Sequence, residues 1–553
     1  MNPSREEALF ALALEEPATE RNAFPKAVCG DDEVLRYRLE SLLAAHEQPE
    51  TLLAMQADAV RLREDASARH ARPTIQLDLA DAPDKAVGQK LGRYKLLERV
   101  GELDDAASFH LFDVVRRGMF RGTNDDRRDA LMKSLSFFCL LSCLAGTGAL
   151  SVAAADWPQW RGPQRNGLSP ESGLLQAWPA EGPRLDWQVT GIGSGYAAPA
   201  VAGDRVYLLA NETLDNEFVQ ALSVTNGQRL WSTPLGKVGH PNQNPKFPAA
   251  RSTPTIDGLF LFALGSDGDL ACVEIGSGKV RWKRNLRADF GGQPGTWAYA
   301  ESPLIDGDTL ICTPGGSQAT LLGLDKRTGA VRWQCSLPEA DEAGYASAIV
   351  VDFGGTRQVV QLLQKGLVGV DVQTGRFLWR YGKAVSRYGA NIPSPVAHQG
   401  FIYCAAAGTG GGTVKLRATA GGVEAEELYF GPKMPTAIGG AVIVGDHLYG
   451  TTAQTLLCVE LATGEIRWED RALGAAALCV ADGRLYLRAE NGEVGLAEPS
   501  PEGYLERGRF TPPAQPERIS PMEKAWAYPA IAEGRLYLRD HGTLWCYDLR
   551  AAR

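Results

Sequence analysis

The spacing of apolar and polar residues changes along the chain and divides it into two parts. In residues 4–54, apolar side chains such as Leu35, Leu39 and Leu42 recur at steps of three and four between charged residues, which predicts two or three amphipathic helices. From residue 156 onward, short apolar runs alternate with turns rich in Gly, Asp and Thr, a pattern typical of strands joined by hairpins. We therefore expect a small N-terminal α-helical segment followed by an all-β region.

An 11-residue pattern recurs in this β region: a small residue, an acid two positions later, then Thr-Gly or Ser-Gly, and finally Trp, as in Gly323 to Trp333. The acid and Thr can cap a turn, the Gly can take a positive φ, and the Trp can pack on a neighbouring strand. Each copy therefore predicts a β-hairpin. The copies span residues 221–231, 272–282, 323–333, 369–379 and 458–468, the first being the loosest.

A second signature, Pro-x-apolar-x-Gly-Asp-x-apolar-Tyr, precedes the copies of the first pattern. The two patterns together predict a cycle of four strands, which is the size of a propeller blade. The first cycle lacks preceding strands and the last ends at Asp548 without an outer strand. We therefore predict an eight-bladed β-propeller over residues 156–553, closed by pairing of its N-terminal strand with the last blade. The aromatic residue of each fourth strand gives the count: Trp187, Trp231, Trp282, Trp333, Trp379, Tyr429, Trp468 and Phe510.

These repeats resemble those of the PQQ-like propeller family, which includes quinoprotein alcohol dehydrogenases and the propeller lipoprotein of the outer-membrane protein assembly (Bam) complex. The opening Asp156-Trp157-Pro158-Gln159-Trp160-Arg161-Gly162-Pro163 is similar to a branch of secreted, mostly uncharacterised members. The resemblance covers residues 156–553 and implies the fold, while a propeller by itself does not specify an activity.

The N-terminal part resembles the leader of bacterial serine/threonine protein kinases. Its sequence E-E-A-L-F-A-L-A-L-E and the stretch Gly92 to Glu102 carry this resemblance. No phosphate-binding glycines follow, and neither a V-A-I-K lysine nor an H-R-D motif is present, so we expect no phosphotransfer. Two D-F-G tripeptides, at 289–291 and 352–354, are interpreted as hairpin turns. Residues 1–63 are thus expected to form a helical, kinase-leader-like segment, and residues 64–131 a linker with a truncated kinase first strand.

Residues 132–155 have the order of a secretory signal: Met-Lys, an apolar stretch and then Ala153-Ala154-Ala155, with cleavage expected before Asp156. If the segment is not cleaved, it becomes a signal anchor, and the five Arg residues between 116 and 128 hold the preceding side in the cytoplasm. A lipoprotein attached through Cys143 is a further option. We expect an exported protein, periplasmic or extracellular, that is membrane-anchored only through residues 132–155.

Composition narrows the function. The 553 residues carry 57 Lys and Arg against 66 Asp and Glu, which argues against nucleic acid as a partner. The seven His show no metal-ligand spacing. The adjacent Cys-Cys pair and the C-x-x-C-H haem motif of quinoprotein dehydrogenases are absent. Cys272, Cys458 and Cys546 occupy the small-residue position of the repeat and are expected to pack in the core. We expect no catalytic residue, metal or cofactor, although an enzyme is not excluded.

Topology suggests a candidate site, because the loops that lead into the innermost strands of a propeller meet at one mouth of its channel. These loops hold Tyr196, Arg251, Trp297, Tyr299, Glu301, Tyr345, Arg387, Asn391, Trp526 and Tyr528. Such side chains form a binding rim for a protein or glycan, or else they cap the ring and pack on one another. The repeated Trp residues, in contrast, are expected to pack between blades: Trp187, Trp231, Trp282, Trp333, Trp379 and Trp468.

Three hypotheses follow for the function. The first is an exported, non-catalytic scaffold for binding or assembly that uses the channel mouth. The second, implied by the resemblance, is a PQQ- and Ca²⁺-dependent alcohol or sugar dehydrogenase, with Glu301 and Asn391 as calcium ligands and Arg251 or Arg387 facing the quinone. The third is a membrane-anchored sensor derived from a kinase, with an extracytoplasmic propeller.

Overall fold

A computed structural model describes residues 155–239, 249–420, 422–518, 520 and 523–551 in full, and residues 90–91, 94–103 and 106–113 as strands. The chain divides into two compact units, Met1–Ser151 and Val152–Arg553. In the first unit, β1 (Lys90–Leu91), β2 (Tyr94–Leu103) and β3 (Ala106–Asp113) form an antiparallel sheet. The helices expected in residues 1–63 and the signal segment up to residue 154 lie outside the described residues.

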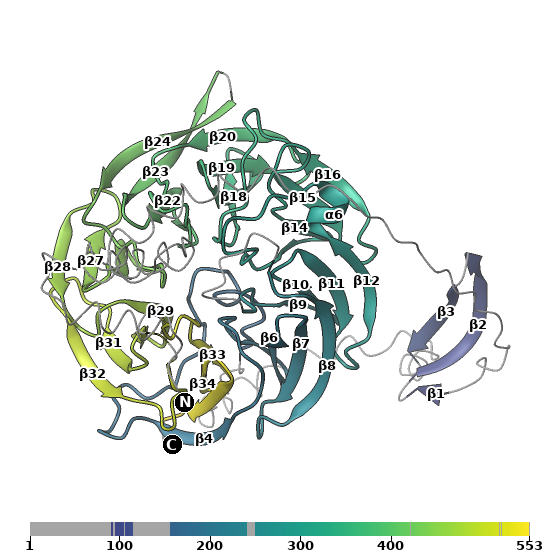
Figure 1. The fold of residues 1–553 in the computed structure, drawn as a ribbon, viewed down its shortest axis with the longest axis horizontal. Helices are drawn as coiled ribbons and strands as arrows, with labels where there is room; N and C mark the ends of the chain where they lie inside the picture. Colours follow the sequence, from purple (N-terminus) through teal and green to yellow (C-terminus); the bar gives the residue numbers. More distant parts are fainter. Residues whose placement is uncertain are drawn as a thin grey trace, which may run out of the picture. The chain divides into compact units, whose positions relative to one another are not determined.

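The second unit is an all-β, eight-bladed propeller, as the repeats predict (Figure 1). Each blade is an antiparallel sheet of four strands. Blades 1 to 4 comprise β5 (Ala200–Ala202), β6 (Arg205–Thr213), β7 (Asn216–Ser223), β8 (Arg229–Gly236), β9 (Thr255–Asp257), β10 (Phe260–Leu264), β11 (Asp269–Glu274), β12 (Val280–Asn285), β13 (Leu304–Asp306), β14 (Thr309–Cys312), β15 (Leu321–Asp325), β16 (Val331–Cys335), β17 (Ile349–Phe353), β18 (Thr356–Leu363), β19 (Gly366–Asp371) and β20 (Phe377–Tyr381).

Within each blade the first strand lies nearest the centre of the ring and the fourth lies at its rim (Figure 1). Blades 5 to 8 comprise β21 (Val396–His398), β22 (Phe401–Ala406), β23 (Gly410–Thr419), β24 (Gly422–Gly431), β25 (Ala441–Val444), β26 (His447–Thr451), β27 (Leu456–Glu460), β28 (Ile466–Asp470), β29 (Ala476–Ala481), β30 (Arg484–Ala489), β31 (Val494–Glu498), β32 (Leu505–Phe510), β33 (Ala530–Ala532), β34 (Arg535–Asp540), β35 (Thr543–Asp548) and β4 (Arg184–Val189). Among the described residues, no helix is both long and apolar enough to cross a membrane.

The repeated hairpin forms for the reason its sequence suggests. In blade 3, Oδ1 of Asp325 accepts hydrogen bonds from the backbone nitrogens of Arg327 (3.1 Å) and Thr328 (3.0 Å). Gly329 takes a φ of 70°, which a side chain would disfavour. Acid, Thr and Gly together therefore fix the turn between the third and fourth strands.

The Trp residues of the repeat connect neighbouring blades. Nε1 of Trp282 in blade 2 donates to the carbonyl of Lys326 in blade 3 (3.1 Å), and a Cβ on Gly329 would come within 2.9 Å of the Trp282 ring. Equivalent bonds of 2.8 to 3.0 Å run from Trp187 to Val224, Trp231 to Ile275, Trp333 to Val372 and Trp468 to Ser500. Each of these rings thus packs on the turn of the next blade.

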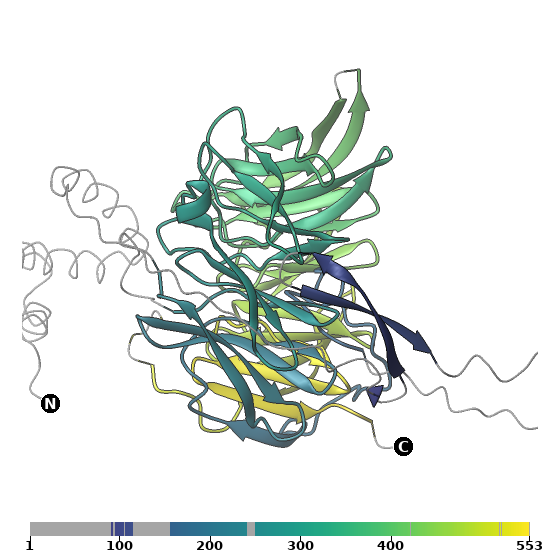
Figure 2. The same cartoon turned by 90° about the vertical axis from the view of Figure 1, so that its right-hand side faces the viewer.

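Blade 5 departs from the repeat, which explains the missing copy of the pattern. Its strands β23 and β24 are each ten residues long and form a hairpin that projects from the ring (Figure 2). Glu427 of β24 accepts hydrogen bonds from the Tyr381 hydroxyl (2.6 Å) and from Nζ of Lys383 (2.7 Å) of the preceding blade. Unlike the Trp residues named above, Trp379 bonds within its own blade, to Gln358 (2.7 Å).

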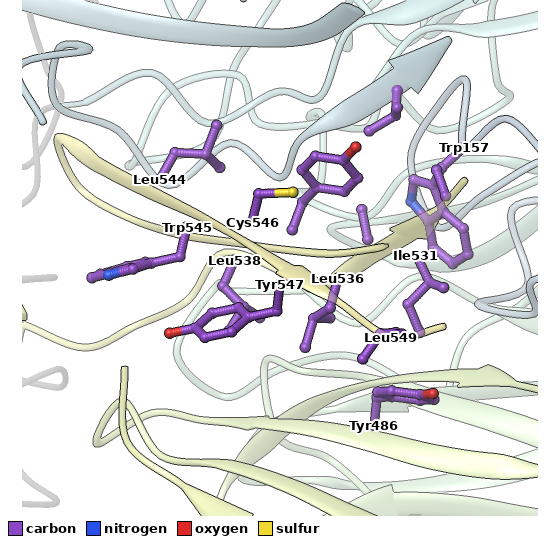
Figure 3. Close-up of a cluster of buried hydrophobic side chains, with 14 of the residues drawn as sticks. Trp157, Tyr486, Ile531, Leu536, Leu538, Leu544, Trp545, Cys546, Tyr547 and Leu549 are labelled. Atoms are coloured by element: carbon purple, nitrogen blue, oxygen red, sulfur yellow. The ribbon is translucent and has the colours of Figure 1, made fainter. Parts of the chain in front are cut away.

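The ring closes as predicted, because β4 pairs with β35 and places Trp187 opposite Cys546. A buried apolar cluster of blades 7, 8 and 1 surrounds this junction, with Trp157 at its edge (Figure 3). Arg539 crosses the junction: Nη1 donates to the carbonyls of Leu209 (2.6 Å) and Ala197 (3.1 Å) in blade 1. Closure therefore combines a strand pair, an apolar cluster and a buried guanidinium.

Other expectations are resolved in the same unit. The seven described cysteines are buried and unpaired: Cys272, Cys312, Cys335, Cys404, Cys458, Cys479 and Cys546. The D-F-G at 352–354 lies in the hairpin between β17 and β18, as predicted. The hairpin interpretation is wrong at 289–291, because Asp289 and Phe290 end the short helix α6 (Leu286–Phe290) and Gly291 caps it with a φ of 64°.

Candidate binding site at the channel mouth

The centre of the ring is occupied by residues 157–169, which we call the plug. The plug contacts the innermost strand, or the loop leading into it, in every blade. Its hydrogen-bond partners, from blade 1 to blade 8, are Val201, Ile256, Ser302 and Pro303, Ala348, Ser394, Ala441, Val480 and Ile531. A segment that bonds to all eight blades lies inside the channel that they enclose.

Two buried arginines hold the plug in place. Arg165 is 3% exposed, and its guanidinium donates to the carbonyls of Ala348 (2.7 Å), Ser302 (2.9 Å) and Pro303 (3.1 Å). Arg161 is 2% exposed and donates to the carbonyl of Ala441. Burial lowers the pKa of Arg165 to about 10, opposed by the charge of Glu301. The plug is therefore tied to the ring through buried polar bonds, which are costly to leave unmade.

The plug enters and leaves through one end of the channel. Oδ1 of Asp156 accepts from the backbone nitrogen of Gly203 (2.9 Å), in the turn that follows β5. Leu174 donates its backbone N–H to Asp482 (2.8 Å), in the turn that follows β29. These turns lie where the innermost strands end. The predicted rim residues precede the same strands, so they belong to the opposite mouth.

At that opposite mouth, four side chains from blades 1, 2 and 8 form a cluster. The ring centroid of Tyr196 is 5.0 Å from that of Trp526 and 5.1 Å from that of His541, both in edge-on geometry. The guanidinium carbon of Arg251 lies 5.4 Å from the Tyr196 centroid, within cation–π range. We call Tyr196, Arg251, Trp526 and His541 the mouth cluster. It presents aromatic area and a cation together.

His541 was not among the predicted rim residues. It lies in the turn between β34 and β35 with a φ of 46°, and the Asp-His-Gly sequence at 540–542 was the available signal. Its Nδ1 is 3.4 Å from Oγ of Ser194 and its Nε2 is 3.3 Å from a Glu523 oxygen. Burial lowers the pKa of His541, opposed by Asp540 and Glu523, while burial raises the pKa of Tyr196 to about 12. A neutral imidazole and a neutral phenol thus meet here at neutral pH.

Three further predicted rim residues lie in the loops of blades 3 to 5. The rings of Trp297 and Tyr345 are 5.8 Å apart, and the Tyr345 hydroxyl accepts from the backbone nitrogen of Trp297 (3.1 Å). Arg387 is exposed. Burial lowers the pKa of Arg251, an effect opposed by Tyr196, Tyr345 and Glu217, so a phenol of this pair and one of the mouth cluster both lie near this guanidinium.

Tyr345 is buried, at 7% exposure, and the other four predicted residues also face inward. Tyr299 and Tyr528 are 1% and 5% exposed, and their hydroxyls donate to the carbonyls of Pro314 (2.7 Å) and Ile438 (2.6 Å). The ring of Tyr528 also packs on Trp160 of the plug, with centroids 4.4 Å apart. These two tyrosines therefore belong to the internal packing and not to the exposed surface.

Glu301 and Asn391 are also engaged internally. The Glu301 carboxylate accepts from the Thr313 hydroxyl (2.6 Å) and backbone and from Gln361 (3.1 Å). The Asn391 amide donates to the carbonyl of Leu363 (2.6 Å), and its oxygen accepts from the backbone of Ser386 (2.7 Å). Burial raises the pKa of Glu301 to about 7. These oxygens are already used, and the described residues contain no group of three His, Cys, Asp or Glu that could hold a metal.

Two cavities accompany the channel. One of about 500 Å³ lies beside the rim loops of blades 3 and 4 and is lined by polar groups such as Gln293, Asp341 and Lys365. Asp341 is committed there, since it pairs with Arg380 (2.7 Å). The other, of about 790 Å³, lies between blades 1 and 2 beside Asp156, at the end where the plug enters. Neither cavity extends through the channel.

Comparison with known proteins places these features in context. A family model described as "Outer membrane protein assembly factor BamB" matches residues 166–295 and 215–470, which together exceed half of the chain. The curated protein of that name from Shewanella oneidensis is 26% identical over 237 residues, 42% of this chain and 53% of that protein. Its namesake from Salmonella typhimurium is 26% identical over 177 residues, 29% of this chain and 41% of that protein. The chain thus spans about half the length of the curated relatives it matches.

Solved structures with low sequence identity were also found. The crystal structure of BamB from Moraxella catarrhalis has a TM-score of 0.46 at 16% identity, covering 66% of this chain and 97% of that chain. Quinohemoprotein alcohol dehydrogenase ADHIIG from Pseudomonas putida HK5 has a TM-score of 0.49 at 12% identity, covering 72% of this chain and 81% of that chain.

Proposed function

Because this chain belongs to the PQQ-like propeller family whose model is described as outer membrane protein assembly factor BamB, we propose that it is an exported, non-catalytic scaffold that binds a protein partner at its channel mouth. The relatives from Shewanella oneidensis and Salmonella typhimurium carry assembly-factor names, and that kind of role supports the proposal. Export is supported by the signal-like residues 132–155.

One observation carries the proposal: the plug fills the channel behind the mouth cluster. A partner at this mouth would contact Tyr196, Trp526 and Arg251 and would not enter an open channel. Small-molecule sites are concave and enclose most of their ligand, whereas protein interfaces favour Tyr, Trp and Arg on an accessible surface. The arrangement therefore favours a macromolecular partner.

The dehydrogenase hypothesis is less well supported by the side chains it requires. Its calcium ligands would be Glu301 and Asn391, whose polar atoms already bond to neighbouring groups of the ring. Calcium takes six to eight oxygen ligands, and no acidic cluster of that kind is found in the described part of the chain. These residues therefore do not fit a Ca²⁺–PQQ site.

Site-directed photo-crosslinking in the full chain, expressed in an exporting host, tests the proposal. A photoreactive residue replaces Arg387 or Trp526 at the mouth, and Leu259, which is 74% exposed at the opposite end, serves as the control position. We expect both mouth positions to capture the same protein, and Tyr196→Ala to reduce this capture severalfold.

Two results would contradict the proposal. Capture of that protein equally well from position 259 would place its interface elsewhere on the ring. Absence of a protein adduct, together with Trp526-dependent retention on a glycan array, would replace the protein partner with a carbohydrate.

A further inference from the structure

The first described residue of the propeller unit lies against a buried carboxylate. The backbone nitrogen of Ala155 is 3.2 Å from Oε1 of Glu171, and Glu171 is 4% exposed. The other carboxylate oxygen, Oε2, accepts from the backbone nitrogen of Gly534 (2.6 Å) in blade 8. Ala155 is thus fixed to the ring through Glu171, an acid that normally requires a charged partner when buried.

The surroundings of Glu171 carry more negative than positive charge. Burial and the charges of Asp156, Glu171 and Asp204 raise the pKa of Glu533, against the opposing charge of Arg535. Arg535 is shared, since it pairs with Asp186 (3.2 Å) as well as with Glu533 (3.8 Å). Two more guanidiniums nearby are also paired: that of Arg205 with Asp204 (3.4 Å), and that of Arg550, beside Gly534, with Asp548 (2.6 Å). A further cation beside Glu171 would therefore be stabilised.

The sequence allows two positions for removal of the signal segment. A signal-type site needs small residues one and three positions before the cut. Cleavage before Asp156 places Ala155 and Ala153 at these positions and matches the A-x-A pattern fully, while cleavage one residue earlier places Ala154 and the larger Val152 there. Only the earlier cut leaves an α-amino group at residue 155, so the choice of that cut rests on the contact with Glu171.

We propose that the chain is cut between Ala154 and Ala155 and that the new α-ammonium of Ala155 forms an ion pair with Glu171. This proposal rests on the proposed export. A signal peptidase would hydrolyse the peptide bond with one water molecule, leaving a carboxylate on Ala154 and an ammonium on Ala155. The neutral amide contact of the uncut chain then becomes a charged one on the same two atoms.

The electrostatics of Glu171 agree with this pairing. In the uncut chain, burial raises the pKa of Glu171, opposed by backbone hydrogen bonds from Gly534, Ala155 and Glu533 and by the charge of Arg535. An ammonium at the position of the Ala155 nitrogen favours the ionised carboxylate and lowers that pKa. The ammonium and the carboxylate thus each favour the charged form of the other.

The intact mass and N-terminal peptide of the exported protein, produced from the full 553-residue chain, give the first test. An N-terminus at Ala155 supports the proposal. An N-terminus at Asp156, lighter by one alanine residue, overturns the ion pair while leaving export in place. Retention of residues before 155 overturns the cut and the ion pair while leaving export in place, because an uncleaved segment is expected to anchor an exported propeller. Absence of the protein from the exported fraction overturns the export on which the ion pair depends.

The second test removes each charge separately from the processed protein. Selective transamination converts the α-ammonium into a neutral carbonyl group, and Glu171→Gln neutralises its partner. We expect either change to lower Tm by about 2–5 °C, and the two together to cost little more than one. Glu533→Gln is the matched control, in which transamination should keep its full effect. Additive effects of transamination and Glu171→Gln would overturn the ion pair.

Discussion

Arg165 donates a 2.9 Å hydrogen bond from Nη2 to the carbonyl oxygen of Ser302, so that a residue of the plug holds the loop leading into blade 3. The same guanidinium reaches Ala348 of blade 4. Replacing a buried donor of this kind leaves carbonyl oxygens without partners, which costs about 1–3 kcal/mol for each group. The plug is therefore expected to stabilise the ring and not merely to occupy its centre.

Arg165→Met tests this role. We expect the free energy of unfolding to fall by about 2–4 kcal/mol, measured by urea denaturation of the purified protein. Arg327→Met is the control, because Arg327 is 70% exposed and its ion pair with Asp308 is long, at 3.7 Å. We expect its free energy of unfolding to change by no more than about 0.5 kcal/mol. Equal midpoints for the two variants would show that the plug does not hold the ring together.

The ring was predictable because its information is local. Each turn is specified by residues within one hairpin, such as Asp325, Thr328 and Gly329, and the count of blades follows from counting the repeats. Closure was predictable from the same count, because the first cycle of strands and the last are both incomplete and together make one blade. The departure in blade 5 was visible as a missing copy, but its long hairpin was not.

The plug was not predicted, although its residues 157–163 were noted as part of a family signature. Trp157, Trp160, Arg161 and Arg165 show neither strand nor helix periodicity. They bond to groups far away in the sequence, which are backbone carbonyls except for the Ser394 hydroxyl that accepts from Trp160. The direction of the rim side chains was equally hidden. Topology brings Tyr196 and Tyr299 to the same end of the ring, but only packing decides that Tyr299 is buried. No local pattern in the sequence encodes that choice.

Contact between a Trp ring and the Gly of the next blade should be measurable through two Gly→Ala substitutions. Gly329 and Gly307 both have positive φ, at 70° and 57°, so both variants pay a left-handed strain of about 1–2 kcal/mol. A Cβ at 329 would also press on Trp282, whereas a Cβ at 307 meets open space.

We therefore expect Gly329→Ala to be less stable than Gly307→Ala by about 1–3 kcal/mol in denaturant unfolding. The difference between the two variants isolates the inter-blade contact, because the backbone strain is common to both. Equal losses would mean that the Trp282 ring moves aside freely and that the repeated Trp residues pack loosely between the blades.

Stability should depend on pH through two buried carboxyl groups. Burial raises the pKa of Glu217 and of Glu301 to about 7, while in the unfolded chain a Glu has a pKa of about 4.3. Between these values the folded protein binds more protons than the unfolded one. The free energy of unfolding therefore falls as the pH rises from about 4.5 to 7, by up to about 2–3 kcal/mol for each group.

Glu217→Gln should flatten this dependence. An amide oxygen can still accept from the backbone nitrogen and hydroxyl of Ser266, which lie 2.8 and 2.7 Å from the carboxylate. We expect the variant to match the parent protein at pH 5.5 and to exceed it at pH 8 in urea unfolding, while the exposed Glu465→Gln follows the parent at both. A parent stability that rises with pH across this window would contradict the assignment.

The last prediction concerns PQQ and Ca²⁺, because the dehydrogenase hypothesis demands that they bind. Glu301 and Asn391 have committed their polar atoms to Thr313, Gln361, Leu363 and Ser386, so a calcium ion would have to displace buried hydrogen bonds. We expect no saturable change in Trp fluorescence, no rise in Tm and no dye-linked alcohol oxidation when both are added. A genuine site would stabilise the fold by about 2.7 kcal/mol at a hundredfold excess over its Kd. A shift of that size that disappears in Glu301→Gln would favour the dehydrogenase over the scaffold, since the variant removes the one acidic ligand that the hypothesis names.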